Sequence, residues 1–196
     1  GRQGLWLATH DGSSMAERLR IDSSGRVGIG CTPTAQFNHS ILQIGNQATL
    51  GANGALSTTG QTYLTHNLYF DPSGNYQVFN TSNANEGTIL RMFDGNFTFS
   101  NSPQTTGTPT VTERMRIDSS GRLLLGTTTE GHSDADDLTL QSASGYTGIT
   151  LRAADTAGGA IYFSDATSGN GEYVGQILYS HASNVMTFAT NASERM

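Results

Sequence analysis

The five histidines are the residues of this chain that could take the most chemical roles, because imidazole can act as an acid, a base or a metal ligand near neutral pH. They are His10, His39, His66, His132 and His181. No two form a His-x-His pair, no serine lies in a nucleophile-elbow context, and no His and Asp complete a visible triad. We therefore expect loop or surface histidines and no catalytic residue. An open alternative is that one histidine meets its symmetry mates in an oligomer and binds a transition metal.

Acidic and glycine-rich segments are further candidates for chemistry. Oxygen ligands of the kind that Ca²⁺ takes gather at 134–137 and at 165–172, but neither segment follows the EF-hand pattern. Residues 25–30 resemble a phosphate-binding loop, yet they lack its Gly-Lys-Ser/Thr ending and a following helical pattern. Cys31 is the only cysteine, which excludes an intrachain disulfide. We expect no cofactor and no metal site, and hairpin turns explain the glycines.

A ten-residue signature is the strongest pattern in the sequence, because it occurs twice and begins a third time. Residues 17–26 and 113–122 match at nine of ten positions, and 194–196 repeat the opening of the same signature. The similarity extends over 17–32 and 113–128, where eleven of sixteen positions are identical. Such recurrence is typical of repeat architectures, so the repeat governs the interpretation of the chain.

The spacing of the signature divides the chain into repeat units. The Glu-Arg starts are 113 − 17 = 96 and 194 − 113 = 81 residues apart. We predict the end of a preceding unit at 1–16, a first full repeat at 17–112, a second at 113–193 and the start of a truncated one at 194–196. Similar strings at 68–75 and 161–170 follow the signature in both full units.

Composition favours a protein that assembles with itself. The chain carries a formal charge of −6, has no lysine and is 13% charged, which argues against a nucleic-acid binder. Leu, Ile, Val and Phe number only 38 of 196 residues, a sparse set for a self-sufficient core. No apolar run approaches the roughly 18 residues of a membrane span. We therefore expect an obligate oligomer, with neither nucleic acid nor membrane insertion.

Alternation of apolar and polar residues predicts short β-strands. The clearest runs are 138–140, 149–153 and 161–163. Clusters such as Ser-Ser-Gly and Pro-Ser-Gly-Asn separate these runs and are typical of turns. Within the signature, Leu19 and Ile21 face one side and the arginines the other, and residues 22–25 turn the chain back. The signature therefore predicts a β-hairpin with one apolar and one charged face.

The charged residues of the signature are candidates for pairing between chains. Seven of the ten arginines lie in its copies, and a guanidinium kept at a fixed place suggests an ion pair. In a symmetric assembly the charged faces would meet and fix the register between chains. The candidates are Glu17, Arg18, Arg20, Asp22, Arg26, Glu113, Arg114, Arg116, Asp118 and Arg122.

The signature, followed by an apolar-Gly-apolar-Gly-x-Thr segment, closely resembles the repeat of bacteriophage tail-fibre proteins, especially those of marine and cyanobacterial phages. The second unit resembles that repeat over nearly its whole length, including 149–151, 161–163 and 191–196. The resemblance implies a homotrimeric, β-rich fibre whose chains wrap together and which serves as a shaft or host-contacting adhesin on a virion. A self-cleaving chaperone often follows such repeats in that family, and this sequence shows none.

Aromatic residues beside amide side chains are the candidates for ligand contact. In the first unit these are Tyr63, Tyr76 and Phe79, since sugar faces stack on aromatic rings while amides bond to hydroxyls. The alternative is that such aromatics belong to the core, which we expect for Tyr69 and Phe70.

Together these patterns predict an all-β fold, an elongated repeat of hairpins and short strands in an interwoven homotrimeric fibre. We expect a structural segment of a phage tail fibre that supports host attachment without catalysis, located on the virion tail, outside the cell. Its partners would be copies of itself, other virion tail proteins, and a host surface glycan or protein receptor. Two alternatives stay open: a glycan-cleaving tailspike hydrolase with carboxylates paired between chains, and a non-viral extracellular adhesin or filament.

A sparse core gives the first testable prediction. Ile21→Asp or Ile117→Asp should abolish assembly and not merely weaken it, because chains with so sparse a core should not stay folded when they separate. Native mass measured by light scattering checks this expectation. A soluble, folded single chain carrying either substitution would contradict it.

Overall fold

The structure is built from β-strands, as the alternating sequence predicts. This computed structural model describes residues 4–36, 39–53, 60–80, 85–105 and 108–195. Within these residues the only helix is a short 3-10 helix, η1 (Gly169–Tyr173). The chain forms two compact units, Gly1–Thr147 and Gly148–Met196, which are described separately below.

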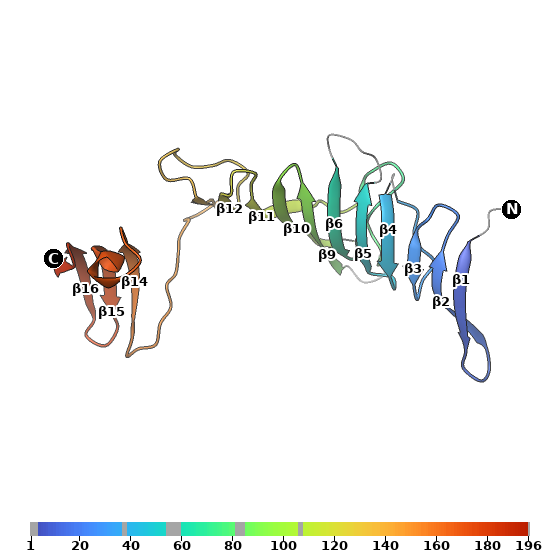
Figure 1. Cartoon of the computed structure of the whole chain (residues 1–196), viewed down its shortest axis with the longest axis horizontal. Helices are drawn as coiled ribbons and strands as arrows, with labels where there is room; N and C mark the ends of the chain where they lie inside the picture. Colours follow the sequence, from blue (N-terminus) through green and yellow to red (C-terminus); the bar gives the residue numbers. More distant parts are fainter. Residues whose placement is uncertain (1–3, 37–38, 54–59, 81–84, 106–107, 196) are drawn as a thin grey trace. The chain divides into compact units, whose positions relative to one another are not determined.

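An eleven-stranded sheet dominates the first unit (Figure 1). Its strands, in spatial order, are β1 (Leu5–His10), β2 (Met15–Ile21), β3 (Val27–Ile29), β4 (His39–Ile44), β5 (Ala48–Asn53), β6 (Gln61–His66), β9 (Asn85–Phe93), β10 (Asn96–Thr105), β11 (Thr112–Ile117), β12 (Leu123–Leu125) and β13 (Leu138–Leu140). Neighbouring strands are antiparallel except β3–β4 and β12–β13, which are parallel. The two missing numbers, β7 (Leu68–Phe70) and β8 (Tyr76–Val78), form a separate two-stranded hairpin.

The hairpin predicted from the signature is confirmed in both full copies. Strand β2 pairs with β3, and β11 pairs with β12 in the same register. An aspartate closes each turn. In the first copy, one Asp22 carboxylate oxygen accepts the backbone N–H groups of Ser24 (2.8 Å) and Arg26 (3.1 Å). The glycine of the turn, Gly25, has φ +78°, which a side chain would strain.

The same turn occurs a third time where the signature is absent. In the β7–β8 hairpin, Asp71 accepts the N–H groups of Ser73 and Asn75, both at 2.9 Å. Gln77 donates to the second carboxylate oxygen at 3.2 Å, the role that an arginine has in the signature. The three turn aspartates are 71 − 22 = 49 and 118 − 71 = 47 residues apart. The 96-residue repeat therefore contains two hairpins of one design, and the arginines mark only one of them.

The β7–β8 hairpin covers part of one face of the large sheet and supplies most of its core. Leu68, Phe70 and Val78 from the hairpin pack with Tyr63 of β6 and Ile89 of β9. We call this side of the sheet the covered face, and the opposite side the open face. The core expected at Phe70 is present, since its side chain is buried. Tyr69 is only half-buried and lies against Phe79, with ring centroids 4.7 Å apart.

The second unit contains a smaller antiparallel sheet. Its strands are β14 (Gly158–Phe163), β15 (Gly175–Ser180), β16 (Val185–Thr190) and β17 (Ser193–Glu194). The register across β14, β15 and β16 equals that across β6, β9 and β10, since Ile161, Ile177 and Phe188 pair as Leu64, Leu90 and Phe99 do.

Two sequence interpretations fail in this unit. Residues 149–153 alternate like a strand but form none, because no neighbouring strand pairs with them. The string at 161–163 resembles 68–70, yet β14 belongs to the four-stranded sheet whereas β7 belongs to the isolated hairpin. Similar Tyr-Phe pairs followed by turn residues caused that misalignment, since local similarity carries no information on strand partners.

Gly51 gives a test of the covered face. It pairs directly with Tyr63, whose ring would lie 2.3 Å from an added Cβ. Gly51→Ala should therefore destabilise the fold by about 1–3 kcal/mol, as overpacking does. Denaturant unfolding measures this, with Gly148→Ala as control because nothing lies within 4 Å of its Cβ position. Equal midpoints for the two variants would contradict the packing described.

Candidate assembly surface

An unbroken apolar row crosses the open face of the large sheet. Directly paired residues of neighbouring strands lie on one face, so the registers define the row. It contains one residue from every strand: Leu5, Ile21, Val27, Leu42, Leu50, Leu64, Leu90, Phe99, Met115, Leu125 and Leu140. None of these side chains is buried in the single chain, and Leu5 and Leu64 are 58% and 52% exposed. Covering one half-exposed leucine would stabilise a complex by about 1 kcal/mol. Covering the whole row would therefore contribute a large free energy of association.

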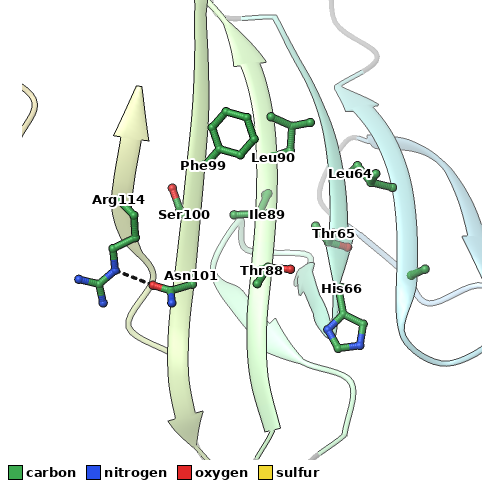
Figure 2. A pocket seen from close by; sticks show the side chains of 11 residues that line it. Leu64, Thr65, His66, Thr88, Ile89, Leu90, Phe99, Ser100, Asn101 and Arg114 are labelled. Carbon is green, nitrogen blue, oxygen red and sulfur yellow. Dashed lines mark hydrogen bonds between the residues drawn. The ribbon is translucent and has the colours of Figure 1, made fainter. Parts of the chain in front are cut away.

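A shallow depression lies in the middle of this face. Its volume is about 540 Å³, and Leu64, Leu90 and Phe99 lie side by side across three strands at its floor (Figure 2). Its polar lining includes His66, Asn101 and Arg114. Two flanking rows of the open face continue the apolar surface. They include Leu7, Leu19, Ile29 and Ile44 on one side, and Met92, Phe97, Ile117 and Leu123 on the other.

A β-bulge in each copy of the signature places its charges. The register between β1 and β2 shifts after Leu7, which pairs with Leu19, while Ala8 pairs with Glu17. Arg18 is the extra residue, so Glu17 turns onto the face of Arg20 instead of the opposite one. The Arg20 Nε and Nη2 atoms then bind the two Glu17 carboxylate oxygens at 2.8 and 2.6 Å. Alternation alone would have placed these two side chains on opposite faces.

The second copy repeats this arrangement. Arg116 binds both carboxylate oxygens of Glu113, at 2.8 and 2.9 Å, next to the same bulge between Phe99 and Ser100. The turn aspartates are paired as well: Arg26 binds Asp22 and Arg122 binds Asp118. Pairing between chains stays a prediction for these residues. The structure adds that each of the four carboxylates has a guanidinium partner in its own chain.

The extra arginine of each bulge behaves differently from the other signature arginines. Arg114 lines the depression on the open face, and its Nε donates to Asn101 Oδ1 at 2.6 Å (Figure 2). Arg18 makes the equivalent bond to Thr9 Oγ1, at 2.8 Å. Arg195, in the third occurrence of Glu-Arg-Met, makes a similar bond to Thr190 Oγ1 at 2.9 Å. Among the described residues these three form no ion pair, and their Nε atoms are held by neutral oxygens of the preceding strand.

Hydrogen bonds lower the pKa of all three turn aspartates. The backbone N–H of Arg122 is the largest influence on Asp118, and the Arg122 side chain adds to it. The N–H of Asn75 does the same for the pKa of Asp71. For Asp22, burial would raise the pKa, but donors of Arg26 and Ser24 outweigh it. The carboxylate form is therefore the one that holds each turn.

The structure corrects one candidate for glycan contact and constrains two. Tyr63 is wrong as a contact, because its side chain is fully buried and its hydroxyl donates to Gln36 Oε1 at 2.9 Å. Burial also raises its pKa. Tyr76 is half-buried and packs on Phe70, with centroids 4.6 Å apart. Phe79 is half-buried against Tyr69. The burial of Tyr63 is indicated by Gly51, the residue paired with it on β5, because only a glycine there leaves room for the tyrosine ring.

Two of the acidic residues at 134–137 contact side chains of the same chain, and these described residues are not grouped as metal ligands. Asp136 accepts Arg122 Nη1 at 2.9 Å, so it extends the ion pair of the turn. His132 Nδ1 lies 3.7 Å from Asp134. Across the described part of the chain, no three His, Cys, Asp or Glu side chains are grouped for holding a metal ion.

No family model matches this chain, and a search of curated proteins finds no match to it. In the ranges that the structure describes, no helix has the length and apolar character needed to cross a bilayer.

The turn aspartates predict a specific pH dependence. Their pKa values are lowered on folding, so their contribution is complete above the unfolded pKa of about 4 and is lost as pH falls through the folded value. Asp118→Asn should lower the melting temperature at pH 7. Between about pH 5 and pH 2, the melting temperature of the variant should fall less than that of the parent protein. The control is Asp155→Asn, which alters an exposed carboxylate. Parallel melting profiles for Asp118→Asn and the parent protein would contradict this account.

Proposed function

We propose that this chain is a structural segment of a bacteriophage tail fibre. In this proposal three copies form a β-rich fibre on the virion tail, outside the cell, that supports host attachment without catalysis. The observation that carries the proposal is the recurrence of one charged hairpin. The bulge, the bidentate ion pair and the aspartate turn are the same in β2–β3 and in β11–β12, and both hairpins belong to one continuous sheet.

Recurrence within one sheet suits a shaft. Each hairpin adds strands beside those already present, so main-chain hydrogen bonds join successive units directly, without a linker. The resemblance of the signature to tail-fibre repeats supports the proposed location of this architecture on a virion. A rigid shaft holds attachment surfaces in fixed geometry, and three identical surfaces multiply weak contacts into avidity.

The proposed partners are two further copies, other virion tail proteins, and a glycan or protein receptor on the host. The half-buried Tyr76, and Phe79 beside Tyr69, stay the aromatic candidates for receptor contact. Phage origin is tested by the neighbouring genes, which should encode other tail components.

Light scattering on the purified segment, before and after heating in detergent, tests the assembly. We expect a mass of three chains that persists in cold detergent and falls to one chain on heating, because interwoven chains separate only when they unfold. The heated sample is the control for single-chain mass. A compact, folded single chain before heating would refute the proposal.

A further inference from the structure

We propose that the open face of the eleven-stranded sheet is the surface by which copies of this chain pack together, with equivalent strands at the same level. This inference rests on the proposed fibre and goes further, because it assigns the inner surface of the assembly. The apolar row from Leu5 to Leu140 becomes the core, and the covered face, with its β7–β8 hairpin, faces outward.

The extent of the row identifies the kind of occupant. It crosses all eleven strands without a charged residue. With strands about 4.8 Å apart, the row is roughly 48 Å long; together with the flanking rows, two open-face residues per strand, each taking about 6.6 Å of strand, make the strip about 13 Å wide. That is on the order of 600 Å² in plan, close to the roughly 800 Å² per partner of a stable interface. A peptide or small ligand is too short to cover it.

The chemistry of the face identifies the occupant as another copy. The occupant must present an apolar strip of the same length, and the open face is itself such a strip. The chain also has a small core of its own: on the described residues, the buried apolar side chains are Ile41, Tyr63, Leu68, Phe70, Val78, Ile89, Leu124 and Ala189. Packing against copies supplies the missing core from the same gene product.

The second unit also has an apolar cross-strand row that needs a cover. Ile161, Ile177 and Phe188 form a cross-strand row in the register of Leu64, Leu90 and Phe99. Ile161 and Phe188 are exposed, like Leu64 and Phe99. Two separate sheets with one pattern indicate that a partner runs along the whole chain.

Closed rotational symmetry fixes the relative level of the copies. When identical chains surround one axis, equivalent residues lie at equal heights, so each Leu64 faces the other Leu64 side chains. Arg18 and Arg114 lie at the bulges next to the apolar row, where Thr9 and Asn101 accept from their Nε atoms, and Arg114 lines the central depression.

Single-cysteine cross-linking tests the surface. In a Cys31→Ser background, Leu64→Cys places a thiol in the middle of the open face, and Ser73→Cys places one on the exposed turn of the β7–β8 hairpin. A short bismaleimide should link chains through position 64 and not through position 73. Mixing Leu5→Cys with Leu64→Cys chains should give no link between the unlike positions.

Charge substitution gives a second measurement at the same sites. Leu64→Asp should abolish the three-chain mass, as Ile21→Asp in the same row should, whereas Ser73→Asp should leave it at the parent value. Circular dichroism shows whether the variant chain keeps any β structure. If Leu64→Asp does not fold, the cross-linking result stands by itself.

The outcomes separate this inference from the proposed fibre. A three-chain mass with linking at position 64 supports both. A three-chain mass with linking only at position 73, or with Leu64→Asp still assembled, overturns the inner surface and leaves the trimer. A linked 5–64 pair overturns the equal level of the copies. A parent protein that is a single folded chain overturns both, and a protein or lipid surface would then cover the row.

Discussion

The structure depends on one constraint: a sheet of eleven strands has apolar residues on both faces, and the described residues cover only part of one of them. The β7–β8 hairpin buries Tyr63 and Ile89 on the covered face. On the open face, the row through Leu64, Leu90 and Phe99 has no cover from the described residues. Water on such a row costs free energy at every strand, and the proposed assembly would remove that cost by covering the row.

The ten-residue signature determines the local structure of the large sheet at each of its two full copies. Its bulge carries Glu17 to the side of Arg20, so these two charges neutralise each other on the covered side. Asp22 and Gly25 then reverse the chain within a few residues. One short sequence therefore specifies a turn, a twist in the strand and the pairing of its charges. This combination explains why the segment recurs while the residues between its copies differ.

Sequence alone predicted the β class, the signature hairpin and its turn, since periodicity and turn residues are local properties. It did not predict the in-chain pair of Glu17 and Arg20, because alternation ignores bulges. It missed the equivalence of Asp71 with Asp22, since no arginine follows it. It assigned Tyr63 to a ligand, because its burial depends on Gly51 in a neighbouring strand. The open row shows the same limit: its residues come from eleven strands and align only once the register is known.

Methionine oxidation tests most directly whether the open face is covered in solution. Met92 lies on the open face and is 37% exposed in the single chain. Met15, at the start of β2, is 66% exposed. These exposures alone allow only a small difference in rate. If copies cover the open face, dilute peroxide followed by mass spectrometry should show Met15 oxidised about tenfold faster or more, with the difference lost on heating. Comparable rates in the unheated protein would contradict the account.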